Sequence, residues 1–229
     1  MGIKDKLLKR KPKTEAELER DSRQLGRLQT LLDVVFGLLI FRVFLILPAA
    51  TAADMEGPRD LLVFLGGHSG RYEMVIVGII LLVIYWGQNI KAFGNLKRTD
   101  GTHAAMSIFQ VFLLLIYLYF VRMGVEFRDD IASFFFQSVS LALVGFTAVI
   151  AWSYAIKDRR LISDSLTDRE AREMRFSFMS EPITALITIP FSWLGPIAWT
   201  LAWLADIPIS MLLKRSLPKE VAEEGMNLT

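Results

Sequence analysis

The stretch Arg27–Pro48, RLQTLLDVVFGLLIFRVFLILP, decides the class of fold. It is long enough to cross a hydrocarbon core of about 30 Å, which takes roughly 20 apolar residues in a helix. Asp33 and Arg42 interrupt it. Because a charged side chain is unfavourable inside a bilayer, such residues indicate either a functional site or a hydrogen-bonded network that joins helices.

The whole chain has the composition of a membrane protein. Of its 229 residues 53% are hydrophobic, the net charge is +2 and cysteine is absent. A soluble domain of this size rarely contains so much apolar sequence. The small net charge gives no indication of a nucleic acid partner. The lack of cysteine excludes disulfides, thiolate chemistry and cysteine-ligated metal.

Apolar blocks predict an all-α, polytopic membrane protein with six transmembrane helices. We expect the helices at residues 28–48, 72–93, 104–123, 132–156, 176–193 and 196–213. The fifth block contains Glu181, Pro182 and Pro190, and the sixth contains Asp206 and Pro208. Prolines and polar groups are tolerated in membrane helices when neighbouring helices satisfy the backbone.

The distribution of basic residues predicts the orientation in the membrane. If the N-terminus is cytoplasmic and six helices alternate, 21 of the 26 Lys and Arg residues face the cytoplasm. The predicted outer side holds Arg59, Arg71, Arg122 and Arg128. Such an excess on one side follows the positive-inside rule, so we expect both termini in the cytoplasm.

Three segments follow from this count. Residues 1–26 form a basic cytoplasmic arm, residues 27–213 the six-helix transmembrane domain, and residues 214–229 a cytoplasmic tail. The arm either binds anionic lipid, at about 1 kcal/mol per basic residue, or acts only as a topology signal. Thr167 and Glu170 have the spacing of a capping box and predict a short helix before the fifth span.

The start of the chain has a second interpretation. A basic leader, an apolar stretch and the small residues Ala49–Ala53 resemble a secretory signal peptide. Signal peptides run to about 15–30 residues, whereas this leader would have about 50. The length favours a first helix that is retained.

No enzyme, metal or cofactor site is indicated. Neither His68 nor His103 has a second ligand at metal-binding spacing, and the predicted spans contain no Ser/His pair. Asp33 and Asp206 are the one candidate pair of catalytic carboxylates. The polar residues expected to be buried among the helices are Asp33, Arg42, Gln88, Asn89, Ser107, Gln110, Glu181 and Asp206.

The second predicted span offers partners to the first. Arg27 and Asp33 are six residues apart and lie on different faces of one helix, so they cannot pair well with each other. Trp86 and Asn89 lie near the cytoplasmic end of the second span, at a similar depth. We expect them to receive Arg27 and Asp33.

This spacing resembles that of the transmembrane protein 175 channels. The first helix of that family carries R-x-x-x-F-S-D, where this chain has Arg27 and Asp33 with Leu31-Leu32 between them. The second helix carries Trp, His, Phe and Asp at intervals of three, four and seven residues. The corresponding residues here are Trp86, Asn89, Phe93 and Asp100. The resemblance covers roughly residues 25–213.

The resemblance implies a potassium-permeable channel. Bacterial members consist of one six-helix unit, four copies of which surround a central pore lined by the first helix. Position by position, it implies a pore constriction at Leu38, Arg42 and Leu45, which share one helical face. It also implies support of the pore helix by Arg27, Asp33, Trp86 and Asn89. The implied partners are potassium ions, membrane lipids and other copies of the chain, and a single unit without a sorting signal suits a bacterial inner membrane.

Two departures from the family bear on function. Asn89 replaces a His, so hydrogen bonds are still available but a titratable group is absent. Arg42 replaces an aliphatic layer. A cation about 5 Å from one guanidinium is disfavoured by roughly 3 kcal/mol at an effective dielectric of 20, and a ring of four would add up to about 10 kcal/mol. Potassium conduction therefore requires Arg42 to turn away, to reach the outer surface, or to pair with Asp54, Glu56 or Asp60.

Three functions remain open at this point. The first is a potassium channel gated by dilation and wetting of Leu38 and Leu45. The second is an anion-selective or closed pore, because of Arg42. The third is a non-conducting membrane scaffold whose N-terminal arm recruits partners or lipid. An intramembrane enzyme ranks last.

Overall fold

The computed structural model describes residues 14–51, 54, 57, 59–127 and 130–215. Within these residues every regular element is a helix, which confirms the predicted all-α class. The α-helices are α2 (Glu15–Phe44), α3 (Asp60–Gly67), α4 (Ser69–Gly94), α5 (Gly101–Glu126), α6 (Ile131–Ile156), α7 (Asp168–Ser177), α8 (Ser180–Phe191), α9 (Pro196–Ala202) and α10 (Asp206–Arg215). Short 3-10 helices are η2 (Lys157–Arg159), η3 (Ser192–Leu194) and η4 (Trp203–Ala205).

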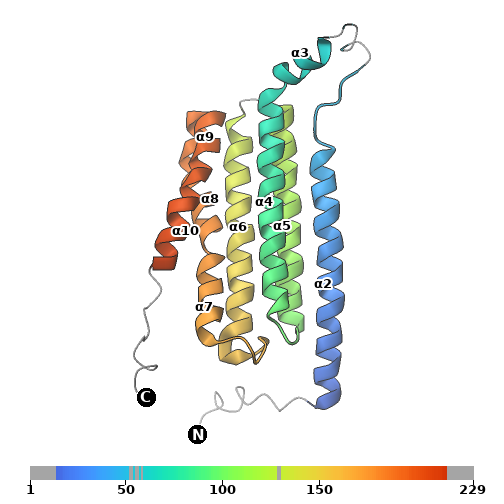
Figure 1. Ribbon diagram of the computed structural model, residues 1–229, viewed down its shortest axis with the longest axis vertical. Coiled ribbons are helices and arrows are strands. Elements are labelled where there is room, and N and C mark those ends of the chain that lie inside the picture. Colours follow the sequence, from blue (N-terminus) through green and yellow to red (C-terminus); the bar gives the residue numbers. More distant parts are fainter. Residues whose placement is uncertain (1–13, 52–53, 55–56, 58, 128–129, 216–229) are drawn as a thin grey trace, which may run out of the picture.

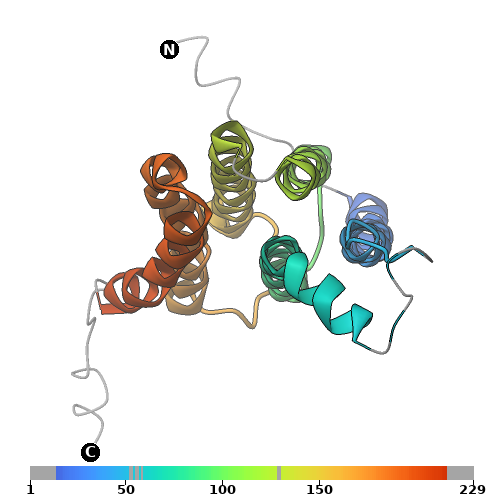
Figure 2. The same ribbon diagram turned by 90° about the horizontal axis from the view of Figure 1, so that it is seen from above.

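The long helices stand side by side as an upright bundle (Figure 1). Helices α7 and α8 stack along α6, and the chain then reverses through α9 and α10. Seen from above, α2 lies at one edge of the bundle and α8 to α10 lie at the other (Figure 2). The first helix is therefore the most peripheral of the long helices.

Helix α2 begins at a capping box inside the predicted arm and continues into the first predicted span. The backbone N–H of Thr14 donates to Glu17 Oε2 at 2.9 Å, and that of Glu17 donates to Thr14 Oγ1 at 3.4 Å. The helix then runs for 30 residues, about 45 Å at 1.5 Å per residue. The predicted boundary between residues 26 and 27 thus lies inside one helix.

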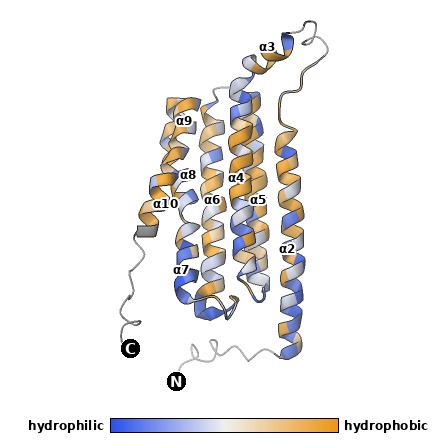
Figure 3. Ribbon diagram, viewed as in Figure 1, coloured by the Kyte–Doolittle hydropathy of each residue, from blue (hydrophilic) through white to orange (hydrophobic). Residues whose placement is uncertain are grey.

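Within the described residues, four segments are long and apolar enough to cross a membrane. They are α4, α5, α6 with η2, and Pro196–Leu213. Each contains an 18-residue window with no more than two charged residues, whereas the apolar part of α2 carries Arg27, Asp33 and Arg42. Hydrophobic residues dominate the middle and upper bundle, and hydrophilic ones gather around α7 and the lower end of α2 (Figure 3). The chain is a membrane protein, and the count of six spans stays a prediction.

The fifth predicted span, residues 176–193, is not one continuous helix. Helix α7 ends at Ser177, and α8 has only 12 residues, about 18 Å in length. Pro182 explains the break, because it has no N–H for a bond to the carbonyl of Phe178 and its ring collides with that group in a regular helix. The helix predicted from Thr167 and Glu170 is confirmed as α7, with both bonds of its capping box formed.

Small residues allow the closest approach between helices. A Cβ on Gly145 of α6 would lie 2.7 Å from Cδ of Pro182, and one on Gly124 of α5 would lie 2.8 Å from Cε of Met74 in α4. In membranes, van der Waals packing of this kind drives helix association because lipid supplies no hydrophobic force between helices.

Candidate functional site

Helix α2 has one packed face and one exposed face. The packed face is buried against α4 and α5, with Phe36 fully buried at its centre. The opposite face carries six large exposed apolar side chains: Leu31, Val34, Leu38, Phe41, Phe44 and Leu45. Leu38 is 61% exposed and Leu45 is 57% exposed. An apolar face of this size requires lipid or another protein surface against it.

Arg42 is exposed in the last turn of the same helix. It lines a cavity together with residues of α4 and α5, including Arg71 and Arg122. These two arginines were predicted only as outer charges, because nothing in the spacing of the sequence shows that three separate helices bring them together with Arg42.

The predicted pairing of Arg42 with Asp54 or Asp60 is wrong for the described residues. Asp54 accepts from the backbone N–H of Thr51 at 2.8 Å and from its hydroxyl at 2.6 Å. These hydrogen bonds hold the pKa of Asp54 below its usual value. Asp60 accepts from the backbone N–H of Gly57. Both carboxylates are thus satisfied by their own turn, and the third candidate, Glu56, lies outside the described residues.

Asp33 and Trp86 meet as expected from their depth. The indole Nε1 of Trp86 donates to Asp33 Oδ1 at 2.9 Å, which joins α2 to α4. This bond and the buried side chains of Leu32, Phe36 and Leu39 together hold one face of α2 against the bundle and leave the opposite face pointing away from it.

Arg27 and Asn89 do not join this pair. Arg27 is exposed and makes no hydrogen bond or ion pair within the described part of the chain. Asn89 Nδ2 donates instead to the carbonyl of Tyr85, one turn back in α4, at 3.1 Å. A carbonyl of its own helix thus competes with the neighbouring helix for the side-chain amide of Asn89. The structure brings together two of the four predicted supports.

Asp100, the last residue of the family-like pattern, joins α5 to α6. Its Oδ1 accepts from the backbone N–H of His103 at 3.0 Å and so caps α5. Its Oδ2 accepts from the hydroxyl of Tyr154 in α6 at 2.8 Å. The guanidinium of Arg160 lies 4.6 Å from the centroid of the Tyr154 ring. An Asp directly before an apolar block indicates an N-cap, but nothing in the sequence indicates Tyr154 as the partner of Asp100.

A small polar cavity lies between α4, α5 and α6. Gln88 Oε1 and Gln110 Nε2 are buried there without partners. The cavity measures about 20 Å³ and is also lined by His103 and Ser107. That volume accommodates one water molecule, which an acceptor and a donor of this kind can hold. Among the described residues, no group of three His, Cys, Asp or Glu could hold a metal ion.

The candidate dyad of Asp33 and Asp206 is not formed. Asp206 begins α10 and accepts from the hydroxyl of Thr184 in α8 at 3.1 Å. Helices α2 and α10 lie at opposite edges of the bundle (Figure 2). Each carboxylate therefore serves a separate contact between helices.

These features define a helical membrane protein whose first helix presents an apolar face outward. The fold is that of a lysosomal potassium-selective channel TMEM175 homolog from Chamaesiphon minutus, whose crystal structure superposes with a TM-score of 0.68 over 83% of this chain and 98% of that chain. The sequences are 14% identical, so the similarity concerns the fold. No family model and no curated protein sequence matches the chain. The resemblance indicated by residue spacing is thus confirmed at the level of the fold.

Proposed function

We propose that this chain is the subunit of a potassium-permeable channel whose pore is lined by the exposed face of α2. The observation that carries the proposal is the outward position of Leu38 and Leu45 in a chain with the fold of a potassium-selective channel homolog. Copies arranged around an axis, four by the family resemblance, bring these faces together. They form a narrow apolar passage that conducts when it widens and becomes wet.

The position of Arg42 decides selectivity within this proposal. Arg42 borders a cavity with residues of α4 and α5, as Leu45 does, and a guanidinium that reaches into this cavity turns away from the pore axis. Potassium then meets apolar layers at Leu38 and Leu45. Asp33 and Trp86 act as supports that hold the helix in register.

A second candidate is an anion-selective or closed pore. The observation in its favour is that Arg42 forms no ion pair with a carboxylate of the described residues. A ring of unpaired arginines favours anions in a pore. The same experiment separates the two candidates.

The test is the reversal potential of purified protein in liposomes across a potassium chloride gradient. Wild type and Arg42→Leu are compared side by side, with Arg59→Gln as a control for loss of an exposed arginine elsewhere. We expect a wild-type potential near the potassium value, little changed by either substitution. A potential near the chloride value, reversed by Arg42→Leu, supports the second candidate. Absence of flux in all three proteins contradicts a conducting channel of either selectivity.

A further inference from the structure

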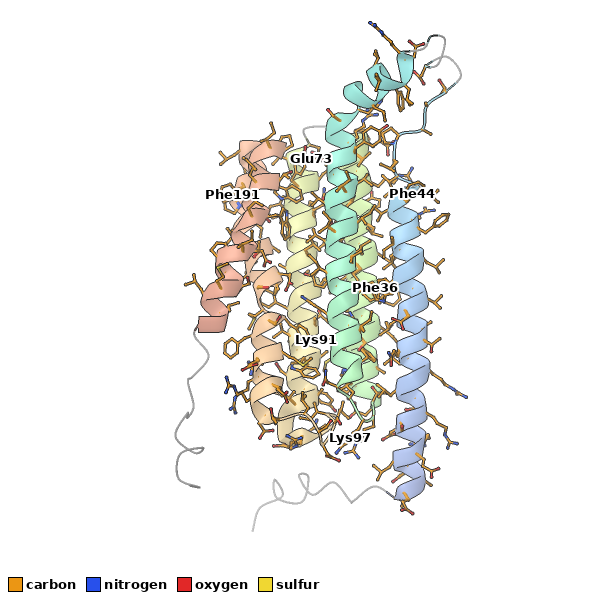
Figure 4. The ribbon with its side chains drawn as sticks, in the orientation of Figure 1. Phe36, Phe44, Glu73, Lys91, Lys97 and Phe191 are labelled. Carbon is orange, nitrogen blue, oxygen red and sulfur yellow. The ribbon has the colours of Figure 1, made fainter. Side chains whose placement is uncertain are left out.

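Three helix ends surround an open cavity at the end of the bundle away from Glu15. Its volume is about 620 Å³. Arg42 lies in the last turn of α2, Arg71 in the first turn of α4, and Arg122 four residues before the end of α5. Phe44 on α2 and Glu73 on α4 mark this level of the bundle (Figure 4). We name this cavity the arginine pocket.

The arginine pocket has an excess of positive charge. Among the described residues, its one acidic lining residue is Glu126, whose Oε2 lies 3.7 Å from Nε of Arg122. Both partners are more than half exposed, so this pair neutralises little. Arg42 and Arg71 make no ion pair within the described residues, and Glu73 lines a different cavity beside Phe134. In the described part of the chain, three arginines thus line one cavity together with one weakly held carboxylate.

The rest of the pocket lining is largely apolar and consists of Leu45, Ile46, Pro48, Leu115, Leu118, Tyr119 and Val125. The α5 residues Leu115, Leu118 and Tyr119 precede Arg122 and lie below it, whereas the other four follow the arginines toward the open end. Leu115 precedes Arg122 by two helical turns, so it lies about 10 Å nearer the start of α5 at 1.5 Å per residue. The pocket therefore combines a cationic rim at the end of the apolar segments with an apolar groove that runs along them.

This combination matches the two parts of a phospholipid. Arginine offers a planar fork of N–H donors that fits phosphate oxygens, and basic pockets between membrane helices bind anionic headgroups. A free anion would use only the rim and would leave the apolar wall uncovered. An acyl chain attached to the headgroup covers both.

We propose that the arginine pocket binds an anionic phospholipid, with the headgroup phosphate between Arg42, Arg71 and Arg122 and an acyl chain along Leu115 and Leu118. The binding does not depend on ion conduction. Where the pore also conducts potassium, the bound phosphate lies beside Arg42 and reduces its repulsion of cations.

Native mass spectrometry of the full chain in detergent tests the proposal without any measurement of flux. The probes are phosphatidylglycerol, phosphatidylcholine and inorganic phosphate. We expect wild type to bind phosphatidylglycerol at least tenfold more tightly than phosphatidylcholine, and an excess of inorganic phosphate to leave that complex intact. Arg71→Gln/Arg122→Gln is expected to weaken phosphatidylglycerol binding by roughly thirtyfold, from the loss of two basic contacts.

Arg59→Gln is the matched control, because Arg59 is an exposed arginine of α3's N-cap that does not line the pocket. It should bind phosphatidylglycerol as wild type does. Circular dichroism of each variant verifies that the helices are intact. Equal binding by the double variant and wild type would overturn the proposal. Displacement of the lipid by inorganic phosphate would overturn the lipid assignment and identify a free-anion site.

Discussion

At the scale of single residues, the bond between Trp86 and Asp33 has the clearest effect on α2. It is the side-chain hydrogen bond, among those described, that ties the apolar part of this helix to the bundle. A half-buried carboxylate that loses such a donor keeps its desolvation penalty without compensation. The bond therefore contributes both to stability and to the orientation of Leu38 and Leu45.

Trp86→Phe is expected to lower the free energy of unfolding by about 1–3 kcal/mol, since it removes the indole donor and leaves Asp33 unpaired. Denaturation in detergent, followed by circular dichroism, measures the change. Trp193→Phe is the control, because Trp193 is 59% exposed. An equal loss in both variants would show that ring size, and not the hydrogen bond, is responsible.

Sequence reasoning anticipated this pair but not the rest of the site. Trp86 and Asp33 could be matched by depth alone, since each lies near the same end of its span. The same depth argument failed for Asn89, because a carbonyl in its own helix is nearer than the neighbouring helix. Arg71 and Arg122 could not be connected with Arg42, because only the packing of three helices defines their distance.

At the scale of elements, two loops at the lower end of the bundle are joined. The backbone N–H of Lys97 donates to the carbonyl of Leu161 at 2.9 Å, and that of Ser163 donates to Asn95 at 2.9 Å. Lys97 Nζ also lies 2.5 Å from Asp164 Oδ1. The hydrogen bond and the charge of Lys97 hold the pKa of Asp164 below its usual value.

A lowered pKa in the folded state gives a stability contribution that is present at neutral pH and is lost as the pH falls through that pKa. We therefore expect Asp164→Asn to lower the Tm at pH 7, and we expect the difference from wild type to shrink and disappear as the pH falls through the lowered pKa of Asp164, where the wild-type carboxyl becomes protonated as well. Thermal unfolding at a series of pH values measures the difference. Lys97→Met should reproduce it, and a difference that persists at low pH would contradict the linkage.

The close contact between α6 and α8 depends on a glycine, Gly145, which has no side chain to hold the helices apart. Gly145→Ala places a Cβ 2.7 Å from Pro182 and is expected to lower the free energy of unfolding by about 1–3 kcal/mol. Gly87→Ala is the control, since nothing lies within 4 Å of its added Cβ, and the change should be neutral or stabilising. Denaturation of the two variants in the same detergent compares them. Similar stability of both would show that α8 shifts freely against α6.

The bounds of the helices show what an apolar pattern can and cannot predict. Helices α4, α5 and α6 agree with their predicted spans within three residues at each end, because their apolar runs contain no interior proline. The fifth block, residues 176–193, contains Pro182, and only its part from Ser180 to Phe191 forms α8, after a break that follows the end of α7 at Ser177. Hydropathy reports where a chain meets lipid, whereas continuity of a helix depends on backbone hydrogen bonds.

At the scale of the whole molecule, the peripheral position of α2 allows a test of the proposed channel. Leu38→Asn is expected to raise potassium efflux from vesicles several-fold, since a polar side chain keeps an apolar constriction wet. Leu204→Asn is the matched control, because Leu204 is also 61% exposed but lies in η4 at the other edge of the bundle. An equal response of the two variants would contradict the assignment of α2 as the pore helix.

The short length of α8 has a consequence for biosynthesis. A helix of about 18 Å cannot span a 30 Å hydrocarbon core by itself, so it cannot leave the translocation machinery as an independent stop-transfer segment. Gly195, with φ of 97°, reverses the chain directly after η3 and leads into the apolar segment Pro196–Leu213. We therefore expect the two arms of this hairpin to enter the bilayer together, with α8 packed against α6 beside Gly145.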